Sequence, residues 1–114
     1  MVTNKSFVPQ RGDVVWITLD PTQGHEQKGR RPGLVISPKI YNQKVGLALV
    51  CPISSKVKGY VFEVPIKLKN LESVVLSDQV RSIDWRARQV IKIQKAPEVT
   101  TQEVQENIRK LLLD

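Results

Sequence analysis

The stretch VVWITLDPTQGHEQKGRRPGLVIS, residues 14–37, sets a long polar segment between two short apolar ones. Residues 14–19 are apolar except for one threonine, and they are rich in β-branched and aromatic side chains, which favours a strand over a helix. Residues 34–37 repeat this pattern just after a proline. We therefore expect two core strands joined by a polar loop.

The loop itself, GHEQKGRRPG at residues 24–33, contains no hydrophobic side chain. It carries groups that transfer protons or bind phosphate, and loops held by a rigid scaffold are where binding and catalytic residues concentrate. The alternative is a solvated connection without function, which describes most charged loops. We favour a functional loop because so many reactive side chain types occur together.

Further short apolar segments follow, and most are separated by Gly, Pro, Asn or charged residues. Strands are predicted near residues 47–51, 60–66, 73–76, 80–83 and 90–93. Residues 38–44 are compatible with one helical turn, and residues 54–59 are expected to form a second polar loop. This spacing of short strands predicts a mainly β domain, a small antiparallel barrel or sandwich, over residues 1–114, with a loose lead-in at residues 1–10.

One helix is predicted at the C-terminal end, over residues 98–113. Thr100 and Glu103 have the spacing of a capping box. Apolar side chains recur along one helical face at Val104, Ile108, Leu111 and Leu112. We expect this face to dock on the sheet, with an oligomer interface as the alternative.

Charge is distributed unevenly over the 114 residues, whose net charge is +7. Residues 1–60 hold nine Lys/Arg against three Asp/Glu, whereas residues 61–114 hold nine against eight. The positive excess therefore lies in the half that contains the polar loop. A basic surface of this kind suits a polyanion, either nucleic acid or an acidic protein.

Several classes of site are disfavoured by composition. Cys51 is the single cysteine and lies in an apolar run, so it is expected to be a small buried hydrophobe. His25 is the single histidine, so soft ligands for zinc are lacking, and no nucleotide-binding glycine loop occurs. We expect no metal and no cofactor. Without a signal-peptide core at residues 1–10 or an apolar run of ~20 residues, the protein is expected to be cytoplasmic rather than bound to a membrane.

The remaining inventory of Arg, Glu, His, Ser and Asp suits cleavage of RNA without a metal. The ribose 2′-hydroxyl attacks its neighbouring phosphate, so the substrate supplies the nucleophile. The protein must accept a proton, donate one and stabilise charge on phosphorus. A positioned acid or base contributes roughly 10²–10⁴-fold, and the planar fork of an arginine can bind two phosphate oxygens.

Five segments resemble the MazF/PemK family of toxin endoribonucleases: GDVVW (12–16), LDPTQGHEQKGRRPGLVIS (19–37), YNQKVG (41–46), KGYVFEV (58–64) and SDQVRSIDWRAR (77–88). The match is collinear and covers nearly the whole chain. It implies a small SH3-like antiparallel β-barrel with a short helix and a C-terminal helix. It also implies a homodimer that cleaves single-stranded RNA at short sequences, leaving 2′,3′-cyclic phosphate and 5′-hydroxyl ends. A MazE-like antitoxin with an acidic tail would cover the RNA groove.

The resemblance assigns four residues to catalysis. Arg31 matches the arginine that acts on the scissile phosphate, and Ser54 matches a position that is often threonine. Glu26 matches a glutamate that acts as a base or orients Arg31. His25 and Asp78 match an acid–base pair in the PemK/Kid branch, but the arginine of that arrangement is Leu76 here. Lining the groove is therefore the alternative role for His25.

A second group is expected to contact RNA bases or phosphates. Its members are polar or charged side chains in or near the two loops and the SDQVR motif: Gln27, Lys28, Arg30, Lys56, Lys58, Asp78, Gln79 and Arg81. Trp16 and Phe62 are expected to fill the core, so recognition would rest on hydrogen bonds rather than stacking. Arg86 and Arg88 flank Trp85, and this cluster is interpreted equally as structural or as RNA-binding.

Two other functions remain open. A non-catalytic SH3-like module that binds nucleic acid or an acidic peptide would account for the basic charge and the barrel pattern. Inhibition of DNA gyrase by a toxin of similar fold would require neither Arg31 nor Glu26.

Overall fold

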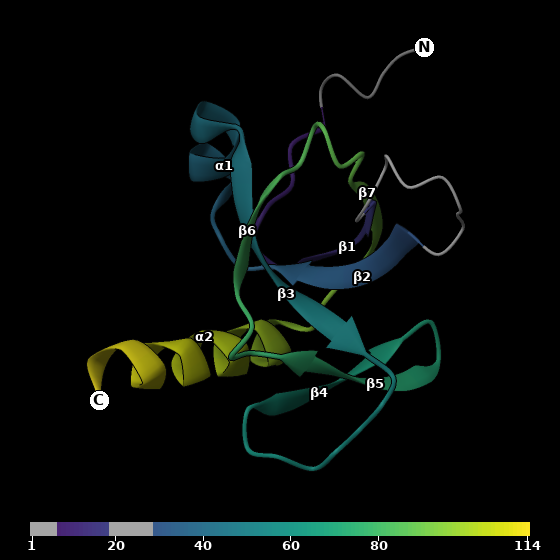
Figure 1. Cartoon of the computed structure of the whole chain (residues 1–114), viewed down its shortest axis with the longest axis vertical. Helices are drawn as coiled ribbons and strands as arrows, with labels where there is room; N and C mark the ends of the chain where they lie inside the picture. Colours follow the sequence, from purple (N-terminus) through teal and green to yellow (C-terminus); the bar gives the residue numbers. More distant parts are fainter. Residues whose placement is uncertain (1–6, 19–28) are drawn as a thin grey trace.

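The computed structural model describes residues 7–18 and 29–114, which form a strongly curled antiparallel sheet with two helices (Figure 1). The strands are β1 (Asp13–Thr18), β2 (Arg30–Val35), β3 (Leu47–Ser54), β4 (Glu63–Leu68), β5 (Leu71–Leu76), β6 (Arg81–Asp84) and β7 (Ile91–Lys95). The helices are α1 (Lys39–Val45) and α2 (Glu98–Leu113). The predicted mainly β class, with a short helix and a C-terminal helix, is confirmed.

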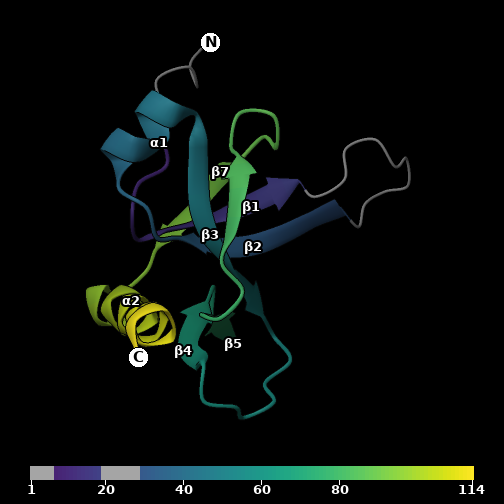
Figure 2. The same ribbon diagram turned by 60° about the vertical axis from the view of Figure 1, so that its left-hand side comes forward.

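Strand β3 connects the two parts of the sheet, whose order is β4-β5-β3-β2-β1-β7 (Figure 2). The first half of β3, Leu47–Val50, pairs with β6, and its middle pairs with β2. Its last two residues, Ile53 and Ser54, pair instead with β5. Because β3 changes partner along its length, the strand bends and the sheet curls around it.

Both faces are buried at Val14 and Val15 of β1 and at Leu34 and Val35 of β2, which explains why these positions are apolar. Val14 and Leu34 belong to a core cluster that also contains Val104 of α2. Val15 and Val35 belong to a second cluster on the opposite side, which includes Trp85. Successive residues of one strand thus pack in different clusters, as the two-residue period of a strand requires.

Three predicted strand boundaries were wrong. Strand β2 begins at Arg30 rather than residue 34, since its backbone pairs with β1 from Thr18 to Val14. Strand β3 continues through Pro52 to Ser54, so Ser54 ends a strand and does not begin a loop. Strand β4 begins at Glu63 rather than residue 60. In each case the length is set by pairing with a neighbouring strand.

Helix α1 is the ambiguous segment after Pro38, and it ends at Gly46 in the left-handed region with φ 82°. Asn42 within it is fully buried, and its Nδ2 donates to the carbonyl of Pro9 at 2.7 Å. Trp85 Nε1 donates to the Asn42 carbonyl at 3.0 Å. These bonds join the N-terminal segment, α1 and the turn after β6, so the role of Trp85 is structural.

Helix α2 has the predicted bounds, but its N-terminal cap and the exposure of its last turn differ from the prediction. It begins at Glu98 after Pro97, whose carbonyl accepts the N–H groups of Thr100 and Thr101, so the predicted capping box was wrong. Val104 is fully buried, but Leu112 is 76% exposed. The C-terminal end of α2 projects beyond the strands (Figure 1), and the helix contacts the core as far as Ile108. Among residues 7–18 and 29–114, no helix is long and apolar enough to cross a bilayer.

Candidate functional site

The candidate site lies where β2 and β3 separate. The two strands pair antiparallel from Val35–Val50 to Gly33–Pro52, and the pairing then stops because β3 turns toward β5. If this register continued, Arg31 would lie opposite Ser54. The divergence instead leaves space between these two residues.

This space is a hollow of about 430 Å3, named here the Ser54 hollow. Its volume lies within the ~300–1,000 Å3 typical of sites for small ligands. The polar and aromatic residues around it are Trp16, Arg31, Ser54, Ser55, Lys56 and Ser73, and the apolar ones are Pro32, Ile53, Leu68 and Leu71. It therefore combines two cations and three hydroxyls with an apolar floor.

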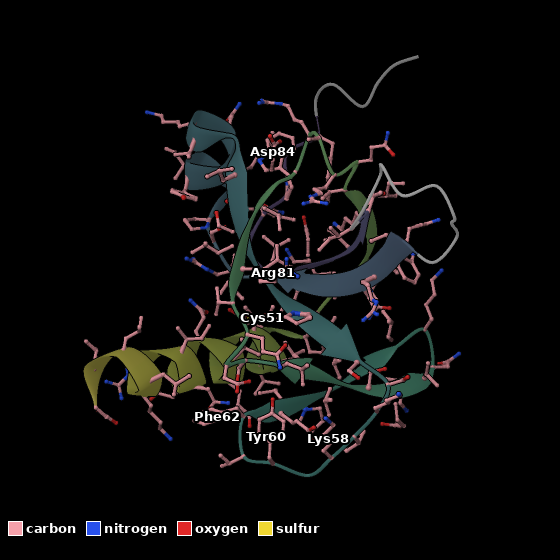
Figure 3. The ribbon with its side chains drawn as sticks, viewed as in Figure 1. Cys51, Lys58, Tyr60, Phe62, Arg81 and Asp84 are labelled. Carbon is pink, nitrogen blue, oxygen red and sulfur yellow. The ribbon has the colours of Figure 1, made fainter. Side chains whose placement is uncertain are left out.

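A second hollow, of about 340 Å3, lies on the other side of Arg31 and is named here the Arg81 hollow. Arg31 and Pro32 line both hollows. The other polar residues around the second one are Gln79, Arg81, Ser82, Asp84 and Arg88. Figure 3 shows Arg81 and Asp84 along β6. Arg31 thus stands between two hollows of different chemistry.

The backbone beneath Arg31 is held in place by Gly33. A Cβ built on Gly33 would lie 2.5 Å from Val50 Cγ1, 3.1 Å from Ile17 Cδ1 and 3.2 Å from the Cys51 carbonyl oxygen. Such close contact leaves no space for a larger residue, so β1, β2 and β3 pack tightly at this point. The tight packing fixes the position from which the exposed Arg31 side chain extends.

The Ser54 hydroxyl is oriented by a local bond, because its Oγ accepts the backbone N–H of Lys56 at 3.0 Å. A hydroxyl that accepts one bond can still donate its proton to another group. The described residues around the Ser54 hollow include no carboxylate, whereas the Arg81 hollow contains Asp84. The Ser54 hollow is therefore suited to an anion that needs a hydrogen-bond donor.

Cys51 lies behind the site and is fully buried, as predicted. Burial, with a smaller contribution from the negative charge of Asp78, raises the pKa of the Cys51 thiol to about 12. The thiol is protonated at neutral pH and is not a nucleophile.

The predicted site residues fall into three groups. Arg31, Ser54 and Lys56 meet at the Ser54 hollow, and Gln79 and Arg81 line the Arg81 hollow. Arg30 is exposed on β2 next to Trp16. His25, Glu26, Gln27 and Lys28 lie outside the described residues.

Lys58 and Asp78 are not among the residues that line either hollow. The N–H groups of Lys58 and Gly59 donate to the carboxylate of Glu63, and the Tyr60 hydroxyl donates to Asp78 Oδ1 at 2.9 Å. Figure 3 shows Lys58 and Tyr60 at the β4 end of the molecule, away from Asp84. Lys58 and Asp78 thus belong to an exposed hydrogen-bonded loop beside the site.

Sequence reasoning missed one residue of the site and left another undecided. Trp16 was expected in the core, but it is only half-buried and lines the Ser54 hollow. Arg88, for which a structural and an RNA-binding role were weighed equally, lines the Arg81 hollow, and its Nη1 donates to the Thr18 carbonyl at 3.4 Å. Strand periodicity gave no signal for Trp16, because Val14, two residues earlier on the same face, is fully buried.

Residues 10–112 match the family model described as PemK-like, MazF-like toxin of type II toxin–antitoxin system. The chain is 48% identical over 86 residues to the endoribonuclease toxin MazF of Escherichia coli K12, covering 75% of this chain and 78% of that protein. It is 34% identical over 109 residues to the Escherichia coli endoribonuclease PemK, covering 91% and 81%.

Solved structures agree with these relatives. The crystal structure of MazF (Form-I) from Deinococcus radiodurans superposes with a TM-score of 0.81 at 44% identity and covers 94% of this chain and 98% of that one. The MazE–MazF complex (Form-II) from the same organism gives a TM-score of 0.82 at 39% identity, covering 95% and 98%.

Proposed function

Since the chain belongs to the family of PemK-like, MazF-like toxins of type II toxin–antitoxin systems, we propose that it is a metal-independent endoribonuclease that cleaves single-stranded RNA at short specific sequences. One observation carries the proposal. Arg31, an exposed cation on a rigid strand, borders two hollows at once, and Ser54 lies across one of them. A phosphodiester bound at Arg31 would have one nucleotide on each side.

In the proposed reaction, the ribose 2′-oxygen attacks the adjacent phosphorus and the bond to the 5′-oxygen of the next nucleotide breaks. The products are a 2′,3′-cyclic phosphate and a 5′-hydroxyl. Arg31 stabilises the negative charge that develops on the phosphoryl oxygens, a contribution on the order of 10²–10³-fold for one preorganised donor. The Ser54 hydroxyl donates a hydrogen bond to the same group.

Proton transfer is assigned to residues that precede β2. Glu26 accepts the proton of the 2′-hydroxyl or orients Arg31, and His25 is a candidate acid for the departing 5′-oxygen. The other basic and amide side chains hold the strand: Gln27, Lys28, Arg30, Lys56, Gln79 and Arg81. Lys58 and Asp78 contribute from the neighbouring loop.

The proposed partners include one that would bind the positive surface around Arg31, Lys56 and Arg81. We assign the protein a homodimeric state in the bacterial cytoplasm and a MazE-like antitoxin whose acidic tail competes with RNA. Solved complexes of MazE with MazF are among the similar structures. An acidic peptide fits the site because its carboxylates can replace phosphates at Arg31, Lys56 and Arg81.

Incubation of the purified protein with a mixed-sequence RNA in EDTA tests the proposal. Discrete cuts with 5′-hydroxyl ends are expected. Arg31→Ala should abolish cleavage at unchanged thermal stability, whereas Arg109→Ala should cleave normally, because Arg109 pairs only with Glu106 on the exposed surface of α2.

Cuts in the wild-type reaction that bear other ends, or full activity of Arg31→Ala, would contradict the proposal. Salt-dependent binding of RNA without cleavage would instead support a non-catalytic binding module.

A further inference from the structure

Trp16 is the aromatic residue of the Ser54 hollow. It lies on β1 in register with Pro32 of β2 and Ile91 of β7. Unlike Val15 and Ile17, it belongs to neither core cluster and is only half-buried. A large ring that borders a hollow beside two cations is not explained by packing alone.

The ring is held by a cation on its surface. The guanidinium carbon of Arg30 lies 4.9 Å from the centroid of the Trp16 ring. Such a pair is worth ~0.5–1 kcal/mol at exposed sites and favours the ring orientation that faces the guanidinium. The positive charge of Arg30 also lies where a phosphate next to the ring would benefit from it.

We propose that Trp16 is a stacking platform for one base of the RNA, that of the nucleotide on the Ser54 side of the phosphate bound by Arg31. The inference rests on the proposed function, since it names a subsite for the same substrate. Every base has a π-face, so stacking on an aromatic ring tolerates different sequences. The walls next to the ring are apolar at Leu68 and Leu71, which suits the flat face of a base.

The hydrogen-bonding groups of the Ser54 hollow favour holding a base in place over recognising which base it is. Ser73 Oγ donates to the Leu71 carbonyl at 3.2 Å, and Ser54 Oγ already accepts from Lys56. Long side chains that read base edges lie instead in the Arg81 hollow, at Gln79, Arg81 and Asp84. The Trp16 subsite therefore orders the strand beside the reacting phosphate and leaves base selection to the other side.

Two matched substitutions separate stacking from packing. Trp16→Phe keeps a π-face, and Trp16→Leu keeps apolar volume without one. A short RNA that the wild-type protein binds is made uncleavable by 2′-O-methylation, and dissociation constants are measured by fluorescence anisotropy. Trp16→Leu should weaken binding roughly 5- to 150-fold, and Trp16→Phe should retain most of the affinity. Equal losses in two variants of equal thermal stability would overturn the inference.

Removal of single bases from this RNA identifies the stacked nucleotide. One abasic position should weaken binding to the wild-type protein but cause no further loss in Trp16→Leu, as in a double-mutant cycle. Losses that add at every position would overturn the inference. Because this RNA is not cleaved, the cycle gives its result whether or not the protein cuts unmodified RNA, and absence of cutting there would contradict only the proposed function.

Tryptophan fluorescence gives an independent test of stacking on Trp16. Trp85 is buried and hydrogen-bonded to Asn42, so it should not respond to RNA. Bound RNA should quench the emission of the wild-type protein and leave that of Trp16→Phe unchanged. Equal quenching of both proteins would contradict stacking on Trp16.

Discussion

The two hollows beside Arg31 differ in the side chains that they present. Besides Arg31, the Ser54 hollow has one lysine, three short hydroxyls, an indole ring and an apolar floor, whereas the Arg81 hollow has several long side chains with both donors and acceptors. Short groups on a strand hold a reacting phosphate in one position, and long groups can follow the edge of a base. Under the proposed function, we therefore expect chemistry and sequence recognition on opposite sides of one arginine.

The difference originates in the path of β3. The strand pairs with β6 at its start and with β5 at its end, so it brings one hollow beside β6 and the other beside β5. The contact of β3 with β2 at Gly33 lies between them. A substitution at the contact of β3 with β2 should affect both hollows. A substitution of a residue that lines a single hollow should affect that hollow alone.

Among substitutions outside Arg31 itself, the largest combined effect on stability and activity is expected for Gly33→Ala. The added methyl would meet Val50 Cγ1 and the Cys51 carbonyl, and overpacking of this kind costs ~1–3 kcal/mol. Displacement of Arg31 should also lower cleavage by ~100-fold, since a misplacement near 1 Å can have that effect. Urea unfolding and single-turnover cleavage measure the two losses.

Adding Val50→Ala to Gly33→Ala tests whether this contact causes the loss of stability. Truncation of Val50 removes the nearest obstructing atom, so the double variant should be less destabilised than the sum of the single variants. Strict additivity would show that Gly33 is not held by this contact.

A more local effect, on the rate but not on stability, is expected for Ser54→Ala in the Ser54 hollow. Loss of a hydrogen bond to a charged group costs ~1.5–3 kcal/mol, so kcat should fall about 10- to 150-fold. Ser54→Thr should restore most of the rate because it keeps the hydroxyl. Comparable activity of the alanine and threonine variants would remove Ser54 from the reaction.

The smallest effect is expected for the lysines of the loop after β3. Lys56 lines the Ser54 hollow, whereas Lys58 is exposed beyond it. Lys56→Gln should weaken RNA binding several-fold and reduce its dependence on salt by about one phosphate contact. Lys58→Gln, the matched control, should change binding less, and a larger loss for Lys58 would extend the site toward β4.

Much of the fold could be predicted because its signals are local. The apolar segment before Asp20, the buried Cys51 and the one-sided pattern from Val104 to Ile108 each follow from short-range periodicity, and the structure confirms them. The group that caps α2 could not be found in this way, although its first residue, Glu98, was predicted. The Pro97 carbonyl rather than a Thr100 side chain satisfies the first N–H groups, and this depends on the backbone path out of β7.

The candidate site likewise contains residues that could be predicted from the sequence and one that could not. Arg31, Ser54, Lys56, Gln79 and Arg81 could be named from motifs that resemble a known family, and the structure adds that they line two separate hollows. The position of Trp16 beside Ser54 could not be predicted, because it depends on where β3 leaves β2. No feature within either strand's own sequence marks that point.

The amino-acid sequence by itself determined the strand-forming segments, the amphipathic helix, the positive charge and the reactive side chains. Only the tertiary structure decided that Arg31 faces Ser54 across a hollow, that Trp16 lies outside the core and that Leu112 is exposed. The physical reason is the separation along the chain of the residues that interact. Periodicity and charge act between near neighbours in the chain, whereas the register of β2 on β3 and the bend of β3 toward β5 arise from hydrogen bonds between distant residues.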